Sequence, residues 1–400
     1  MQTIEYIIKA SEYTAFAYFS MSCLYVFVFA VAGHFYTKRE VVKNSIENKI
    51  AVLIPAYKED AVVVEVAKSA LQQKYHSDMF DVVIIADSLQ QETLKQLSKI
   101  SVKVVEVSFE KSTKSKALNA AMETIDSNYD YAVVLDADNI MEDDFLYKMN
   151  IAFNNGFQIV QGHRKAKNMN TSFAILDAAS EEINNQIFRK GHSTFGLSSG
   201  LIGSGMGFDY TLFKTMMKSV KAIGGFDKEL EFKFAEKKIT IEYLQDAIVL
   251  DEKIEKSEDF SNQRRRWLST QFVYLHRYFR KSWKELFLNG NINFFDKVWQ
   301  LTIPPRILLL GITFLVVIIY FFLVFGFGFK TNVPFSLWLA NLLIVVSAFL
   351  LALPRSFYNS NTLKAILSLP TAFFTMFMLL FKLKGANKNF IHTKHSALKN

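Results

Sequence analysis

The sequence predicts an α/β domain, with a mostly parallel sheet and helices on both faces, joined to transmembrane helices near both ends of the chain. Two observations lead to this fold class. Hydrophobic residues make up 50% of the 400 residues, and their longest uninterrupted runs lie near the two ends. Between these runs, short β-rich stretches alternate with helical patterns, which is typical of βαβ units in a parallel sheet.

The first apolar run, residues 14–36, is uncharged over 23 residues, which is enough to cross a hydrocarbon core of about 30 Å as a helix. It follows an N-terminal segment, 1–13. Its late start and its length disfavour a secretory signal peptide. Two further uncharged runs, 307–329 and 333–353, are separated by a very short connection and predict a transmembrane hairpin.

A fourth apolar run, residues 365–381, is shorter and contains Pro370, so we expect either a transmembrane or a re-entrant helix. The basic tail that follows, 382–400, favours the re-entrant or in-plane alternative because spanning would export its lysines. Lysines and arginines beside the first two spans predict an integral plasma (inner) membrane protein whose middle segment is cytoplasmic. The aromatic, amphipathic stretch 283–305 predicts an interfacial helix region.

The net charge of +8 is concentrated in the basic tail. It therefore indicates contact with membrane lipids and no nucleic-acid partner. The single cysteine, Cys23, lies in the first span, so an internal disulfide and a cysteine-based metal site are both excluded.

The central segment, residues 38–282, contains the predicted sheet. Five runs read as strands and two as helices: strands at 49–57, 80–87, 102–107, 131–138 and 157–162, and helices at 59–73 and 114–125. Ligands of such sheets bind at the carboxyl ends of the strands. The candidate site residues are therefore those that end or follow the first, second and fourth strands: Pro55, Tyr57, Glu59, Asp87, Asp136 and Asp138.

Asp136 and Asp138 are separated by one small residue after a buried strand. Two carboxylates at this spacing can hold a divalent cation, Mg²⁺ or Mn²⁺, while substrate phosphates complete its coordination. A turn or a helix cap is the alternative explanation for this pair.

Three arginines precede a tryptophan in "SNQRRRWLST", residues 261–270. Arginine forks match phosphate oxygens, and an aromatic face can stack on a sugar ring. Binding to anionic lipid headgroups is the alternative for this cluster.

Six segments appear in a characteristic order: "IPAYKED" (54–60), "KSKALNAAM" (114–122), "LDADN" (135–139), "VQGHRKAKN" (160–168), "GSGMGF" (203–208) and "QRRRW" (263–267). With these motifs, residues 48–282 resemble the family 2 glycosyltransferases with a GT-A fold. They resemble in particular the membrane-embedded branch that includes cellulose, chitin and hyaluronan synthases.

The resemblance implies roles for individual residues. It implies that the nucleotide-sugar donor is bound by Pro55, Tyr57, Glu59, Asp87, Lys114, Asp136, Asp138, Gln263 and Arg266, with Asp136 and Asp138 also holding the metal. It implies that Gly203, Ser204 and Trp267 contact the acceptor. The catalytic base is expected in "GGFDKELEFKF" (224–234), where the family's acid motif is altered. We favour Glu229 over Asp227 as this base because Glu229 aligns with the family's aspartate.

The implied activity is that of an inverting membrane glycosyltransferase, a hexosyl- or N-acetylhexosaminyltransferase, that moves a sugar from a UDP donor to a growing polysaccharide chain. Three or four spans are few for a polymer channel, so a homo-oligomer or an export partner is implied as well. One alternative is transfer of a single sugar to a lipid-linked or surface glycan acceptor. The other is a catalytically inactive scaffold in a polysaccharide export complex, which the altered acid motif leaves open.

Overall fold

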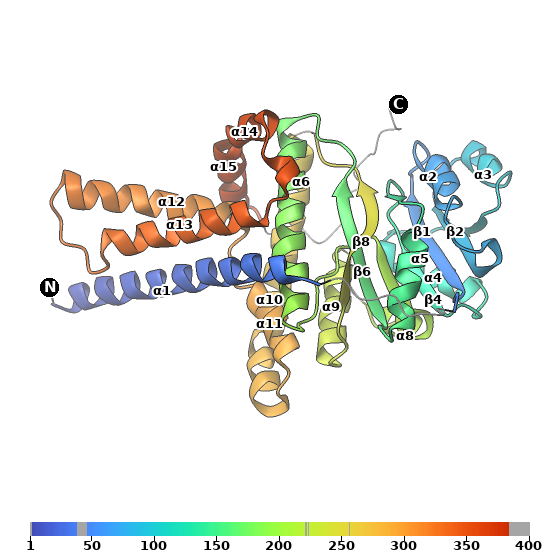
Figure 1. Cartoon of the computed structure of the whole chain (residues 1–400), viewed down its shortest axis with the longest axis horizontal. Coiled ribbons are helices and arrows are strands. Elements are labelled where there is room, and N and C mark those ends of the chain that lie inside the picture. Colours follow the sequence, from blue (N-terminus) through green and yellow to red (C-terminus); the bar gives the residue numbers. More distant parts are fainter. Residues whose placement is uncertain (1, 38–45, 221, 223, 256, 384–400) are drawn as a thin grey trace.

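The computed structural model describes residues 2–37, 46–220, 222, 224–255 and 257–383 (Figure 1). The basic residues 38–45 after the first span, and residues 384–400 of the basic tail, lie outside these ranges. An α/β domain forms one side of the molecule, and three long apolar helices project from the other side.

An eight-stranded mixed sheet forms the centre of the domain, in the order β3-β2-β1-β4-β7-β6-β8-β5. The pairs among β1 to β4 and the pair β6-β8 are parallel, whereas β7 and β5 pair with their neighbours in antiparallel fashion. All five predicted strands are present. The strand bounds are Ile50–Tyr57 (β1), Phe80–Asp87 (β2), Lys103–Val107 (β3), Tyr131–Val134 (β4), Ile140–Met141 (β5), Ile159–Ala166 (β6), Met206–Asp209 (β7) and Glu242–Asp251 (β8).

Alternating residues of the strands pack into two hydrophobic cores, one on each face of the sheet. In β1, Val52 and Ile54 face one core, and Ala51 and Leu53 face the other. Successive side chains of a strand point to opposite faces, so continuous apolar runs suit a sheet that is buried on both sides. The first core includes α2 (Val63–Ala70), α3 (Gln91–Leu97) and α5 (Phe145–Asn154), and the second includes α4 (Lys114–Thr124), α8 (Tyr210–Met217) and α9 (Phe226–Glu236).

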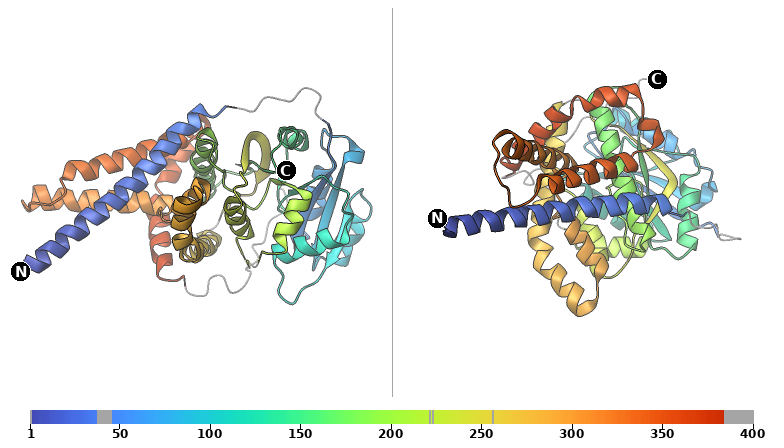
Figure 2. Two further views of the ribbon diagram at one scale, coloured as in Figure 1. Left: turned by 90° about the horizontal axis from the view of Figure 1, so that it is seen from below. Right: turned by 60° about the vertical axis from the view of Figure 1, so that its left-hand side comes forward.

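Three described helices are long and apolar enough to cross a membrane: α1 (Gln2–Ala32), α12 (Arg306–Phe321) with its π-helical extension to Gly326, and α13 (Phe335–Ala352). They lie close to the three predicted spans, but α1 begins at Gln2, so most of the predicted segment 1–13 is part of the same helix. Figure 2 shows all three leading away from the same side of the domain. Side chains where they meet, including Cys23, Leu309 and Val345, form one buried apolar cluster.

A layer of helices connects the domain to these three helices. It consists of α6 (Ser172–Asn184), its π-helical continuation η3 (Asn185–Gly191), α7 (His192–Thr194), α10 (Ser257–Asn289) and α11 (Ile292–Gln300). The contact between α1 and η3 is close, because a Cβ atom on Gly191 would lie 2.3 Å from the carbonyl oxygen of Phe29. The predicted boundary between 282 and 283 falls inside α10, which continues without a break.

The fourth apolar run, 365–381, contains all of α15 (Leu369–Leu380) and only the end of the preceding helix α14 (Ser360–Ile366). The two helices are bent by 43° relative to each other. Figure 1 shows α15 steeply inclined to α12 and α13, beside the domain. Its Phe373 and Met376 pack in one cluster with Leu268 of α10 and Leu308 of α12. A bent pair of this kind fits either a broken span or a re-entrant segment, so both alternatives for this run stay predictions.

Candidate active site

The carboxyl ends of β1 and β2 lie side by side, with Tyr57 paired to Asp87. Each strand is followed by a non-glycine residue in the left-handed region, Lys58 at φ 56° and Ser88 at φ 60°. The amide of Lys58 donates to the carbonyl of Asp87 at 3.1 Å. Such conformations are costly, and they concentrate at functional sites. The structure thus brings the candidates Pro55, Tyr57, Glu59 and Asp87 to one edge of the sheet.

Lys114 connects three of the predicted motifs. It is the first residue of α4, whose start is fixed by the Thr113 side chain accepting from the amide of Lys116. Its Nζ contacts Oδ1 of Asp136 at 2.5 Å and donates to the carbonyl of Gly203 at 2.6 Å. One ammonium group therefore joins the end of β4 to the glycine-rich loop.

Ser204 holds that loop in place from inside the domain. It is fully buried, and its Oγ accepts from the amide of Asp136 at 2.9 Å and donates to Oδ1 of Asn139. Gln161 donates to the carbonyls of Ser204 and Gly205 at 3.0 and 3.2 Å. Ser204 is thus placed as a positioning residue, whereas its neighbour Gly203, at φ 86°, lines the cavity described below.

The two carboxylates predicted to hold a metal have different surroundings. Asp136 is partly exposed and paired with Lys114, whereas Asp138 is 4% exposed and shares the Nδ2 group of Asn139 with Asp251. Among the described residues, no group of three or more His, Cys, Asp or Glu side chains is arranged to hold a metal ion. Two carboxylates suit a Mg²⁺ or Mn²⁺ ion that takes its remaining ligands from water and a bound diphosphate.

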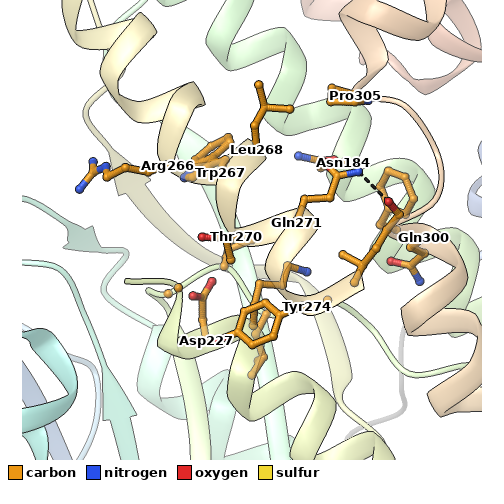
Figure 3. A pocket seen from close by; sticks show the side chains of 18 of the residues that line it. Asn184, Asp227, Arg266, Trp267, Leu268, Thr270, Gln271, Tyr274, Gln300 and Pro305 are labelled. Carbon is orange, nitrogen blue, oxygen red and sulfur yellow. Dashed lines mark hydrogen bonds between the residues drawn. The ribbon is translucent and has the colours of Figure 1, made fainter. Parts of the chain in front are cut away.

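A cavity of about 520 Å³ begins at this edge of the sheet and continues past α10 towards α1 and α12. Seven of the predicted site residues line it: Lys114, Asp136, Gly203, Asp227, Gln263, Arg266 and Trp267. Figure 3 shows Arg266, Trp267, Thr270 and Tyr274 on α10, with Asp227 on the neighbouring helix. Trp267 is 44% exposed, and the guanidinium of Arg264 lies over its ring, 4.3 Å from the ring centre. Pro55, Tyr57, Glu59, Asp87, Asp138, Ser204 and Glu229 are not part of this lining.

Asp227 and Glu229 are both in the first turn of α9 but face different surroundings. Asp227 lines the cavity, and a Cβ atom on Gly203 would lie 3.8 Å from its Oδ2. Burial raises the pKa of Asp227, partly opposed by the charge of Lys228. Glu229 is buried away from the cavity, with Lys233 at 3.6 Å.

Residues two apart on a helix point about 200° away from each other, so only one of this pair can face the cavity. Asp227 is the one of this pair that lines the cavity, and Glu229 is buried elsewhere.

A buried ionic cluster of Glu231, Lys228 and Lys297 was not predicted from the sequence. The carboxylate of Glu231 contacts Lys228 at 2.9 Å and Lys297 of α11 at 3.2 Å, and it accepts from the amide of Leu201 at 2.9 Å. Burial alone would raise the pKa of Glu231, but Lys228 and Lys297 reverse this and lower it to about 2. The three-residue spacing of Lys228 and Glu231 on α9 was a usable signal, whereas Lys297 is too distant in sequence to be recognised.

A family model described as "Glycosyltransferase like family 2" matches residues 48–270. The chain belongs to this family. The predicted family and the GT-A-like fold are confirmed by this match. Membership of the cellulose, chitin and hyaluronan synthase branch stays a prediction. No curated protein sequence matches this glycosyltransferase.

Solved structures of glycosyltransferases resemble this chain. Mannosyltransferase PcManGT from Pyrobaculum calidifontis, in complex with GDP-Man and Mn2+, has a TM-score of 0.53 and 13% identity, covering 84% of this chain and 96% of that one. S. aureus TarS 1-349 with UDP has a TM-score of 0.37 and 16% identity, covering 54% and 63%. Glucosyl-3-phosphoglycerate synthase from Mycobacterium tuberculosis, in complex with Mn2+, UDP and glucosyl-3-phosphoglycerate, has a TM-score of 0.35 and 16% identity, covering 52% and 72%. At 13% identity, the likeness to PcManGT shows the fold alone.

Proposed function

We propose that this family 2 glycosyltransferase is an inverting membrane enzyme that transfers a sugar from a nucleotide donor to an acceptor bound in the cavity beside Trp267. The observation that carries this proposal is the meeting of Lys114, Asp136, Asp227, Arg266 and Trp267 around one cavity. These side chains supply cations for a diphosphate, a carboxylate base and an aromatic surface for a sugar ring.

In this proposal the base is Asp227. Its position in the cavity lets it accept the proton of the attacking acceptor hydroxyl, and burial keeps its pKa above the ordinary value, which strengthens it as a base. Glu231 is a third carboxylate on the same helix, after Asp227 and its rival Glu229. Its two lysine contacts hold it as a carboxylate of low basicity, which suits a structural role.

The donor would lie along the carboxyl ends of β1, β2 and β4, with Pro55, Tyr57, Glu59 and Asp87 towards the nucleoside. Lys114, Gln263 and Arg266 would then hold the diphosphate. Asp136 and Asp138 are the residues that would hold Mg²⁺ or Mn²⁺, which neutralises charge on the departing diphosphate when bound. The structure of PcManGT is a complex with GDP-Man, so GDP-sugars are tested as donors beside the predicted UDP-sugars.

Single-sugar transfer fits the spans better than export of a polymer through one protomer. The facing side chains of α1, α12 and α13 are buried in one apolar cluster, so the space between these helices is packed. Elongation of a polysaccharide stays the second candidate, because Trp267 is exposed in a cavity that extends towards the spans. It would require a second copy or an export partner to carry the chain across the membrane.

The test uses the purified full-length protein in detergent, with Mn²⁺ or Mg²⁺, UDP- and GDP-sugars, and a membrane lipid extract. Nucleotide release and product size are measured together. Asp227→Asn is expected to lower kcat by about 10²- to 10⁴-fold with little change in nucleotide affinity, because only the proton acceptor is lost.

Glu229→Gln is the matched variant on the same helix, and it is expected to lower kcat far less. If Glu229→Gln lowered kcat far more than Asp227→Asn, the base would be Glu229. A single-sugar product supports the proposal, whereas a ladder of products supports elongation. Absence of nucleotide release with every donor would leave the inactive scaffold as the remaining alternative.

A further inference from the structure

The cavity extends well beyond the residues assigned to sugar transfer. Its distal end, as we call the part next to the spans, is lined by Val26 of α1, Phe188 of η3, Ile303, Arg306 and Met376 of α15. In Figure 3, Asp227 and Arg266 lie on one side of the view, and Asn184 and Pro305 lie on the other. Val26 and Arg306 belong to helices with the length and composition of membrane spans. One cavity therefore joins the reaction site to the region where a membrane would lie.

The lining is strongly cationic. It contains eight lysines and arginines, Lys114, Arg164, Arg189, Lys228, Arg264, Arg266, Lys297 and Arg306, against three acids, Asp136, Glu181 and Asp227. Some of these cations contact carboxylates, as Arg164 and Arg189 do with Glu181. The excess of positive charge favours an anionic ligand.

Arg306 differs from those paired cations. Its guanidinium donates to Oδ1 of Asn184 and, at 2.6 Å, to Oγ of Ser180, which are both neutral. Within the described residues, no carboxylate contacts it at ion-pair distance. Arg264 and Arg189 repel it from nearby, and the carboxylates of Glu181 and Asp177 attract it from beyond contact distance. Charges withdrawn from water are costly unless they are paired, so this position suits a ligand that brings the counter-charge.

Arg264 gives a second and independent indication at the same end. It is 6% exposed, lines the cavity, and bonds Asp177 through one terminal nitrogen. Its Nε atom is buried without a hydrogen-bond partner among the described residues. Buried polar groups are normally satisfied, so this unused guanidinium donor suits a hydrogen-bond acceptor on a ligand in the cavity.

We propose that the distal end binds the phosphate of a lipid-linked acceptor, with Arg306 as the phosphate ligand. The lipid chain then lies against the partly exposed Phe188, Leu301 and Pro305, and the group to be glycosylated points towards Asp227. Arginine forks match phosphate oxygens, and the apolar side chains around Arg306 favour an anion that carries a hydrocarbon chain. This inference rests on the proposed transferase function, because it names the acceptor of the same cavity.

The experiment measures equilibrium binding of radiolabelled farnesyl phosphate to the purified full-length protein in detergent. Farnesol, inorganic phosphate and an acidic oligosaccharide serve as competitors. Farnesyl phosphate is expected to bind at least about 10-fold more tightly than each competitor, because none of them combines a phosphate with a hydrocarbon chain. Arg306→Gln is expected to weaken binding by about 10- to 100-fold, the range for losing a hydrogen bond to a charged group.

Asn184→Asp is a second variant, included so that the test does not depend on Arg306→Gln folding correctly. It keeps the size of the side chain but gives Arg306 a carboxylate partner, so it should also weaken farnesyl phosphate binding by about 10-fold or more. The added carboxylate pairs with Arg306 and also repels an anion at the distal end, so unchanged binding in this variant would show that the phosphate does not lie beside Asn184 and Arg306. Arg355→Gln removes an exposed arginine outside the cavity and should leave binding as it is. Retained nucleotide binding shows that each variant is folded.

Several results would overturn the inference: equal affinity for farnesol, equally tight inorganic phosphate, preference for the acidic oligosaccharide, or unchanged binding in both Arg306→Gln and Asn184→Asp. Its failure is separable from failure of the proposed function. Nucleotide release without Arg306-dependent farnesyl phosphate binding refutes only the lipid site. Arg306-dependent binding without sugar transfer to any acceptor refutes the transferase proposal and the role of the lipid as acceptor, while the phosphate site at Arg306 stands.

Discussion

Replacing Glu231 with glutamine should strongly destabilise the domain. Glu231 is almost completely buried, and its carboxylate is shared by Lys228, the amide of Leu201 and the fully buried Lys297. A glutamine keeps the size of the side chain but cannot neutralise either lysine. Lys297 would then be a buried cation with no negative charge in contact among the described residues.

The magnitude follows from the pKa of Glu231. Its ordinary value is 4.5, and the two lysines outweigh burial and bring it to about 2. Each pKa unit corresponds to about 1.36 kcal/mol, so this difference is worth about 3 kcal/mol of stability. Breaking a buried ion pair by removing one partner typically costs about 3–5 kcal/mol, which agrees. For a domain of this size we expect a fall in melting temperature of roughly 6–12 °C.

The dependence on pH has a definite sign. The folded-state pKa lies below the unfolded value, so the stabilisation is fully present above about pH 4.5 and is lost as the pH falls towards 2. Thermal unfolding of the detergent-solubilised protein, followed by intrinsic fluorescence, should show the largest difference between wild type and Glu231→Gln near neutral pH. The difference should shrink on acidification.

Glu236→Gln is the matched control, since it removes a carboxylate from the end of the same helix, where Glu236 pairs with the partly exposed Lys281. Exposed ion pairs contribute about 0–1 kcal/mol, so this variant should melt within about 4 °C of wild type. The reasoning fails if Glu231→Gln melts like Glu236→Gln at pH 7. It also fails if the effect of Glu231→Gln persists undiminished at low pH.

Three further predictions concern the reaction site and the helix layer. In a pH profile of kcat/KM, the activity should fall on the acid side with a midpoint above 3.8, the ordinary pKa of an aspartate. Burial raises the pKa of Asp227, and activity is lost as the pH falls through that pKa. A midpoint at or below 3.8 contradicts this. Asp138→Asn should abolish the stimulation of nucleotide release by Mn²⁺, measured by titrating the metal after chelation, whereas Asp251→Asn should retain part of it. Gly191→Ala should destabilise the protein by about 1–3 kcal/mol, because the new Cβ atom meets the backbone of Phe29. Gly326→Ala is the control for the thermal unfolding assay. Its Cβ atom would contact Phe322 at 3.8 Å, so this variant should be nearly neutral.

The parts of the fold predicted from sequence are those whose signal is local. Strands such as Ile50–Tyr57 and Phe80–Asp87 are continuous apolar runs bounded by polar residues, and α4 begins at a threonine cap. The short strand β7, Met206–Asp209, was missed because two antiparallel neighbours, β4 and β6, define it through long-range pairing. Its glycine-rich sequence reads locally as a loop.

The site shows the same division. Lys114 and Asp136 could be predicted because Lys114 begins a recognisable helix and Asp136 follows a recognisable strand. In the structure, Nζ of Lys114 lies 2.5 Å from Oδ1 of Asp136. Which of Asp227 and Glu229 lines the cavity could not be predicted, because it depends on the rotation of α9 against the glycine-rich loop. A motif alignment fixes sequence position, but the helical rotation decides which carboxylate faces the cavity.

The helix α10 links the chemistry to the proposed membrane surface. It is one helix of 33 residues, which corresponds to about 50 Å. Arg266 and Trp267 line the cavity on this helix, while Phe287 and Leu288 at its far end are 75% and 70% exposed. Exposed apolar residues at the tip of a helical hairpin are suited to the interfacial region of a bilayer. Because the helix is continuous, its depth in the interface would fix the height of Trp267 above the membrane, and hence how far a lipid-linked acceptor must extend to reach Asp227.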